Sequence, residues 1–357
     1  MTSGPALLIT RDDLLLDDLL RLAAAAGVSL DVAHDATSGL RGWSTAALVL
    51  VGADLVPRVA EQRPPRRDSV HVVGHGPVGS DVFRNALGAG ALDVIELPSA
   101  EAWLVELLSD AVDAADGAPG PGAQTVGVVA GSGGAGATTF ACALALTAAA
   151  DRRAMLVDLD PLGPGVDRVV GLDPGSGVRW DALVSSRGRL GSRSLRAALP
   201  AKDGLAVLTW EIGAPADLDS ISVREVLSAA QRGNDLVVLD LPRAVDDVTA
   251  EVVGRCDRVL LVVEPTVAGV AAAGKVAAAF REFNDRLGLV VRGGPSAADP
   301  AQVSAVLRLP LVVEVGRQRR LAEHVDLGVG PVHRHGSALA RAARATLAVP
   351  DLRDALA

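Results

Sequence analysis

A glycine-rich stretch between a strand-like run and a helix-like run constrains this chain more than any other feature. It reads VVAGSGGAGATTFA, from Val128 to Ala141. Its spacing meets the phosphate-binding pattern G-x-x-x-x-G-K-[ST], except that Ala137 stands where the pattern has lysine. A loop of this kind follows a buried strand and opens a helix, so this region is expected to form an α/β sheet with a ligand site at a strand end.

Apolar runs alternate with helix-like stretches along the whole chain, which is typical of parallel sheets covered by helices on both faces. In the first part, short apolar runs predict strands at 6–10, 46–51, 70–73 and 93–97. In the second part, valine- and leucine-rich runs without alternation predict fully buried parallel strands at 126–130, 154–157, 205–209, 235–239, 258–263, 288–291 and 311–315.

A Gly/Pro/Ala-rich segment, DAADGAPGPGAQ, separates these two parts and predicts an interdomain linker at 113–124. The expected organisation is therefore two α/β domains, one at 1–112 and a doubly wound, mostly parallel one at 125–357. In such sheets ligands bind at the carboxyl ends of the strands, so polar residues at those ends are the candidates for function.

Composition narrows the classes of function. The chain of 357 residues has a net charge of −9 and only 2% aromatic residues, which argues against a nucleic-acid surface, since such surfaces need basic patches or stacking rings. No uncharged apolar window approaches the ~18 residues of a membrane span, and the amino terminus lacks the basic start of a secretion signal. We therefore expect a cytoplasmic protein whose membrane contact is at most peripheral.

Acidic residues follow two of the expected buried strands. Asp158 and Asp160 lie in LVDLDPLG, and Asp240 lies in DLVVLDLPR. Three carboxylates that converge at strand ends repel one another unless a cation lies among them, and Mg²⁺ prefers such oxygen ligands. Together with the hydroxyl of Thr138 at the start of a helix, they predict a Mg²⁺ site.

The loop, the Asp-x-Asp-Pro turn and the Asp-Leu-Pro turn occur in the order found in the MinD/ParA family of deviant P-loop ATPases, which the chain resembles from Thr125 onward. The resemblance is closest to the CpaE-like branch, which includes actinobacterial septum-site-determining proteins. It implies Mg²⁺ ligation by Thr138, Asp158 and Asp240, a water-positioning role for Asp160, and ATP or ADP as the ligand. The nucleotide-binding residues that it implies are Gly131, Ser132, Gly133, Gly134, Ala135, Gly136, Ala137, Thr138 and Thr139.

The family's loop reads K-G-G-x-G-K-T-T, and both of its lysines are replaced here, by Ser132 and Ala137. Main-chain amides and the positive end of the following helix can still hold a phosphate. Hydrolysis is expected to be affected more than binding. Loss of one electrostatic contact to the transferred phosphoryl group raises the activation barrier by about 3 kcal/mol, which slows the reaction at least about a hundredfold. We expect weak nucleotide binding and very slow hydrolysis, with Arg243 as the best-placed catalytic substitute and Arg168 as the second.

Two other interpretations of the loop stay open from the sequence. Gly131, Gly133 and Gly136 also satisfy G-x-G-x-x-G, and Asp158 lies 22 residues after Gly136, near the place of a ribose-binding acid, which suits an NAD-dependent oxidoreductase. The missing lysines also suit a scaffold that binds no nucleotide. The family's adenine-reading asparagine corresponds to Arg292 or Gly293, so base recognition is less secure than phosphate binding.

Residues 5–112 resemble a response-regulator receiver domain, with ALGAGALDVIELP at 86–98 similar to the receiver's closing helix, strand and turn. The aspartate, hydroxyl and lysine that a receiver uses for phosphoryl acceptance would fall on or near Gly52, Gly74 and Leu97, and Asp54 comes two residues late. The resemblance implies a receiver-like (flavodoxin-like) fold without phosphoryl chemistry, whose remaining role is docking or dimerisation.

Together, the two resemblances imply a regulator that acts through partner proteins. The MinD/ParA and CpaE-like resemblance implies a nucleotide-dependent switch that positions or controls division-septum or Flp-type pilus and secretion machinery, with a homodimer as one expected form. It further implies that these partners recruit the cytoplasmic protein to the membrane or septum.

Overall fold

The computed structural model describes residues 6–67, 69–116, 123–173, 175, 177–184, 190–213, 217–293, 298–332 and 336–349. The chain divides into two compact units. The first comprises Met1–Gly120 with Gly188–Arg193, and the second comprises Pro121–Arg187 with Ser194–Ala357. Helix α5 (Glu101–Asp116) covers the first residues of the expected linker, and 117–122 lie outside the described residues.

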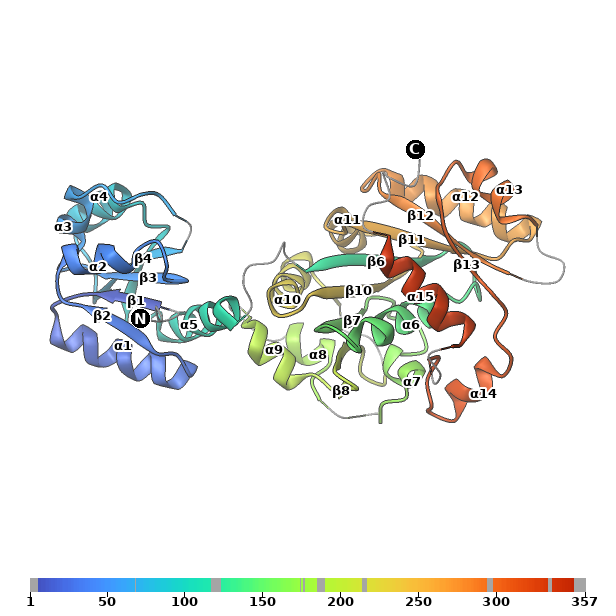
Figure 1. Ribbon diagram of the computed structural model, residues 1–357, viewed down its shortest axis with the longest axis horizontal. Helices are drawn as coiled ribbons and strands as arrows, with labels where there is room; N and C mark the ends of the chain where they lie inside the picture. The colour runs from blue at the N-terminus through green and yellow to red at the C-terminus, as the bar shows by residue number, and fades with distance from the viewer. Residues whose placement is uncertain are drawn as a thin grey trace. The chain divides into compact units, whose positions relative to one another are not determined.

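The first unit is a five-stranded parallel sheet with helices on both faces (Figure 1). Its order, β2-β1-β3-β4-β5, is that of a flavodoxin-like sheet. The strands are β1 (Ala6–Ile9), β2 (Leu30–Ala33), β3 (Leu48–Gly52), β4 (Val70–His75) and β5 (Asp93–Leu97). The helices before α5 are α1 (Asp13–Ala26), α2 (Ala36–Gly42), α3 (Val56–Glu61) and α4 (Ser80–Ala89).

Alternating strand residues build two apolar cores, one on each face of this first sheet. Leu8 and Leu50 belong to the core that includes α1 and α5, whereas Val49 and Val51 belong to the core with α2, α3 and α4. The sequence does not predict β2, because Asp31 interrupts its short apolar run; two of its four residues are exposed.

The second unit holds an eight-stranded sheet in the order β13-β12-β11-β6-β10-β7-β9-β8, parallel except for the short β8. The strands are β6 (Gln124–Ala130), β7 (Ala154–Asp158), β8 (Ala201–Lys202), β9 (Leu205–Leu208), β10 (Leu236–Leu241), β11 (Arg258–Val263), β12 (Leu287–Arg292) and β13 (Leu311–Val315). The helices are α6 (Ala137–Ala149), α7 (Val166–Val170), α8 (Trp180–Val184), α9 (Ser192–Ala198), α10 (Ser220–Gly233), α11 (Asp247–Gly254), α12 (Val267–Arg281), α13 (Pro300–Leu307), α14 (Leu321–Asp326) and α15 (Ala338–Ala348). The predicted fold class of two mostly parallel α/β domains is confirmed.

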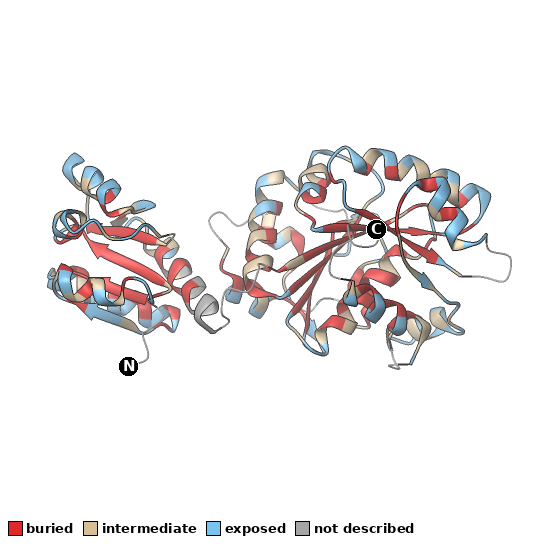
Figure 2. Cartoon of the chain, turned by 45° about the horizontal axis from the view of Figure 1, so that its top comes forward, coloured by how far each residue is buried: buried red, intermediate tan, exposed pale blue. Residues whose placement is uncertain are grey.

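Helix α6 lies at the centre of the second unit and is apolar on nearly all sides. It packs against the sheet and α15 on one face, whereas α10 to α13 lie on the other face (Figure 1). The central strands are buried along almost their full length (Figure 2), which explains why they read as unbroken apolar runs in the sequence. In the described part of the chain, no helix combines the length and the apolar character needed to cross a membrane.

Strand order and register bring the glycine-rich loop and the aspartates Asp158 and Asp240 to one edge of the second sheet. Strand β10 lies between β6 and β7, and Asp240 is the register partner of Asp158 on β7. The glycine-rich loop leaves β6 at this same edge, because β6 and β10 are parallel. The site therefore forms where three neighbouring parallel strands end.

Candidate functional site

The glycine-rich loop is held in a shape that its glycines permit. The Gly131 amide donates to the Val262 carbonyl at 2.8 Å, which ties the start of the loop to β11. Gly134 and Gly136 have φ angles of +75° and +91°, where side chains are strained. The loop leads directly into α6 at Ala137, and the first amides of a helix have no intrahelical acceptors. The loop therefore ends in free donors suited to an anion.

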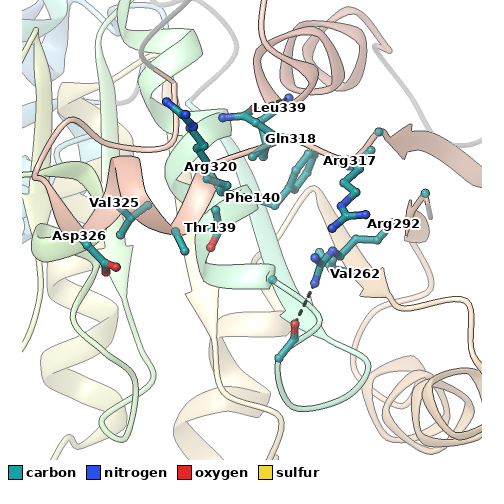
Figure 3. Close-up of a pocket in the computed structure, with 17 residues that line it drawn as sticks. Thr139, Phe140, Val262, Arg292, Arg317, Gln318, Arg320, Val325, Asp326 and Leu339 are labelled. Carbon is teal, nitrogen blue, oxygen red and sulfur yellow. Dashed lines mark hydrogen bonds between the residues drawn. The ribbon is translucent and has the colours of Figure 1, made fainter. Parts of the chain in front are cut away.

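Arg292, at the end of β12, contacts the loop directly. Its Nη1 donates to the carbonyls of Gly134 at 3.0 Å and Ala135 at 3.3 Å (Figure 3). Ala137, at the position of the missing lysine, is only 5% exposed and belongs to the core around α6. Positive charge thus reaches this loop from β12, two strands away from β6, and contacts the loop through its carbonyls.

Asp158 is a buried carboxylate whose oxygens are already engaged. One oxygen accepts from the Thr209 hydroxyl at 2.7 Å and the Val166 amide at 3.2 Å, and the other accepts from the Asp160 amide at 3.2 Å. Burial raises its pKa from 3.8 to about 6, and the three hydrogen bonds offset part of that effect. Asp158 does not line the cavity of about 570 Å³ that begins at the glycine-rich loop.

Asp240 is buried beside Asp158 and has fewer donors. Burial, and then the negative charge of Asp158, raise its pKa well above the ordinary value, while a hydrogen bond with the Thr138 side chain lowers it. No salt bridge to either aspartate is found within the described residues. This pair of carboxylates lacks a countercharge, and the Thr138–Asp240 pairing offers the hydroxyl and carboxylate oxygens that suit Mg²⁺.

Asp160 lies close to the other two aspartates, since its negative charge helps to raise the pKa of both Asp158 and Asp240. Its Oδ1 accepts from the Leu162 amide at 3.1 Å, and the described residues include no group of three or more His, Cys, Asp or Glu side chains arranged to hold a metal ion. A Mg²⁺ site at these carboxylates therefore stays a prediction. Asp160 also lines a cavity of about 560 Å³ together with Trp210 and Arg243.

Arg243 borders two hollows. Besides the cavity that it shares with Asp160, it lines a smaller one of about 470 Å³ with Gly131 and Lys275. The side chains predicted to act in catalysis, Asp160 and Arg243, are thus brought to one cavity. That cavity is not lined by the residues from Gly131 to Thr139.

A third cavity, which we call the loop cavity, has a volume of about 570 Å³ and begins at the glycine-rich loop (Figure 3). Gly134, Gly136 and Thr139 line it on the loop side, and α14 lines it on the other. It contains the guanidinium-bearing residues Arg292, Arg317 and Arg320. The last two are absent from the sequence-based predictions, although the basic run GRQRR at 316–320 directly follows a predicted strand.

In the first unit, Asp54 folds back toward the place where a receiver's phospho-accepting aspartate would lie. Its carboxylate accepts from the Thr10 hydroxyl and the Arg11 amide, both at 2.8 Å. A Cβ added at Gly52 would come within 2.2 Å of Asp54 Oδ1. The carboxylate that is two residues late in the sequence therefore occupies the space of a side chain at position 52.

Comparisons with known proteins agree with this architecture. A profile described as "Rv3660c-like, CheY-like N-terminal domain" matches residues 9–119. The uncharacterized protein Rv3660c of Mycobacterium tuberculosis (strain ATCC 25618 / H37Rv) is 39% identical over 341 residues, which cover 94% of this chain and 95% of that protein.

Solved structures resemble the second unit in fold. A ParA family ATPase from Chlorobium tepidum TLS has a TM-score of 0.56 at 18% identity, covering 63% of this chain and 99% of that one. The septum site-determining protein MinD from Pyrococcus horikoshii OT3, complexed with Mg-ADP, has a TM-score of 0.52 at 17% identity, covering 63% and 94%. The second unit therefore has a MinD/ParA-like fold.

Proposed function

This chain belongs to the Rv3660c-like family, and we propose that it is a nucleotide-binding regulator with little or no ATPase activity. One observation carries the proposal: the loop keeps its glycines at positive φ, its anchor on β11 and the Thr138–Asp240 pairing, although both loop lysines are replaced. The features that shape a phosphate site are kept. The features that accelerate phosphoryl transfer are lost.

In this proposal the residues from Gly131 to Thr139 hold the phosphates of ATP or ADP with their main-chain amides. Thr138 and Asp240 would hold Mg²⁺, with Asp158 behind Asp240 as the second carboxylate of the site. When bound, Mg²⁺ neutralises phosphate charge. Thr209, Val166 and Asp160 fix the orientation of Asp158, so that side chain acts through its charge on Asp240.

Slow hydrolysis follows from where the cations lie. Arg292 donates to carbonyls of the loop, and Arg243 lines one cavity with Asp160 and another with Gly131 at the start of the loop, so neither arginine replaces a lysine at position 137. We propose that Asp160 and Arg243 form the remnant of a catalytic pair, in which Asp160 positions water and Arg243 supplies charge. Without a lysine inside the loop, we expect ATP hydrolysis to be at least about a hundredfold slower than in a loop that carries one.

At the level of the cell, we propose a CpaE-like switch whose bound nucleotide controls contacts with proteins of division-septum or Flp-type pilus and secretion machinery. We further propose a cytoplasmic protein recruited to the membrane or septum by these partners, with a homodimer as one form. In the receiver-like first unit, the Asp54 carboxylate is held by the Thr10 hydroxyl and the Arg11 amide. We therefore propose that this unit does not accept a phosphoryl group at Asp54 and serves in docking.

Calorimetric titration with ATP, ADP and NADH, each with and without Mg²⁺, tests the proposal. We expect weak binding of ATP and ADP that strengthens with Mg²⁺, and loss of that strengthening in Thr138→Ala and Asp240→Asn. No binding of any nucleotide would favour a scaffold that acts through its surface alone. Binding of NADH without ATP would favour an oxidoreductase instead.

A further inference from the structure

The loop cavity extends away from the place where the proposed nucleotide would hold its 5′ phosphates. Consecutive threonines at the start of α6 face different partners, since Thr138 pairs with Asp240 whereas Thr139 lines the cavity. A ligand whose phosphates bind the loop would therefore continue into this cavity with its sugar and base. The volume of about 570 Å³ lies within the range of roughly 300–1,000 Å³ common for small-molecule sites.

The cavity carries more positive charge than a 5′-phosphorylated nucleotide needs there. It is lined by three arginines but by a single carboxylate, Asp326. Arg320 pairs with Glu323 at 3.5 Å, but both side chains are more than half exposed, so that pair is weak. Within the described residues, Arg317 has no carboxylate at salt-bridge distance. The charge of the cavity lining thus favours an anionic ligand.

Arg292 and Arg317 line the same cavity, Arg292 at the end of β12 and Arg317 two residues after the neighbouring strand β13. Figure 3 shows the Arg292 guanidinium directed at the loop, where its Nη1 donates to the carbonyls of Gly134 and Ala135. A guanidinium has five N–H donors, so others remain for a ligand. Two cations that line one cavity are relieved by an anion between them, and a phosphate accepts from guanidinium groups in a bidentate manner. Apolar side chains, including Val315, Leu321 and Leu339, also line the cavity and suit a base or ribose.

We propose that the loop cavity selects a nucleotide that carries a phosphate on its ribose in addition to its 5′ phosphate, and that Arg317, with Arg292, holds the ribose phosphate. This inference rests on the proposed function, because it places the 5′ phosphate on the glycine-rich loop. ATP carries all its phosphates at one end and would leave Arg317 unused. A 3′,5′-bisphosphorylated nucleoside meets the loop and the arginines at once.

The experiment compares ADP with adenosine 3′,5′-bisphosphate by calorimetry on the full chain with Mg²⁺. The two ligands carry the same base and the same number of phosphates. They differ in where the second phosphate lies and in net charge, because two phosphomonoesters ionise further than one diphosphate, so the Arg317 variant is needed to assign any preference to this site. We expect the bisphosphate to bind about tenfold more tightly or better. Arg317→Ala should remove that preference, so that the two ligands bind this variant with similar affinity.

Arg319→Ala is the matched control, because Arg319 is an exposed arginine of the same segment that does not line the cavity. It should keep the preference, and thermal unfolding should show both variants folded. Equal affinity for the two ligands, or loss of the preference in both variants, overturns the inference. If ADP binds with the expected Mg²⁺ dependence but without this preference, only the inference fails. If no nucleotide binds, the proposed function fails and the inference fails with it.

Discussion

Replacing Asp158 with asparagine should stabilise the metal-free protein at neutral pH. The folded protein raises the pKa of this carboxyl from 3.8 to about 6, so between these values the folded state binds more protons than the unfolded chain. Stability therefore falls as the pH rises through this window. The two pKa values differ by about 2.2. At 1.36 kcal/mol per pKa unit, the buried carboxylate lowers the free energy of unfolding at pH 7 by about 3 kcal/mol.

Asparagine removes that cost but keeps only one acceptor oxygen. The side chain would lose one of its contacts with the Thr209 hydroxyl and the amides of Val166 and Asp160, at about 1 kcal/mol. The expected net gain is about 2 kcal/mol at pH 7, and it should vanish below about pH 4, where the native carboxyl is itself neutral.

Urea unfolding in the presence of EDTA, repeated between about pH 4 and pH 8, measures this difference. Tryptophan fluorescence is a suitable probe, because Trp180 donates its indole N–H to the Asp158 carbonyl at 2.7 Å. Asp219→Asn is the control, since Asp219 caps α10 at the surface and its hydrogen bonds with Ser222 lower its pKa. A variant at position 158 that is less stable than the native chain at pH 7, or that differs equally at every pH, would refute desolvation as the dominant effect.

Three further outcomes follow from the loop and its carboxylates. Gly136→Ala should destabilise the second unit by about 1 kcal/mol because its φ is +91°, whereas Gly133→Ala should not, since a Cβ there meets open space; thermal unfolding compares the two. Asp240→Asn should abolish the effect of Mg²⁺ on ATP affinity, and titration in which Mg²⁺ still strengthens binding would contradict its role as a ligand. Ala137→Lys should tighten ATP binding by about tenfold in calorimetry, and no gain would show that the loop does not present this position to phosphate.

The sequence predicts what depends on local patterns. Buried parallel strands read as apolar runs, and the glycines of the loop mark backbone angles that other residues avoid, so β6, α6 and the edge where Asp158 and Asp240 meet could be placed beforehand. Strand β2 could not, because Asp31 interrupts its short apolar run.

Contacts between distant residues escape such patterns. Thr209 lies 51 residues from Asp158, and Arg292 lies 158 residues from Gly134, so nothing in their own neighbourhoods marks them as partners. The surroundings of Asp160 were equally invisible in the sequence, since its carboxylate accepts from the Leu162 amide and lines a cavity with Trp210 and Arg243.

The position of Arg292 shows how a loop can lose its lysines and still be expected to hold a phosphate. A guanidinium bonded to the carbonyls of Gly134 and Ala135 polarises those peptides, whose N–H groups belong to Ala135 and Gly136. The Ala135 N–H already donates to the Ser132 carbonyl at 3.2 Å, so this polarisation also strengthens a hydrogen bond that shapes the loop itself. Arg292 thus holds the loop through its carbonyls, whereas a lysine at position 137 would place its charge on a bound phosphate. We therefore expect this arrangement to preserve weak nucleotide binding better than it preserves hydrolysis.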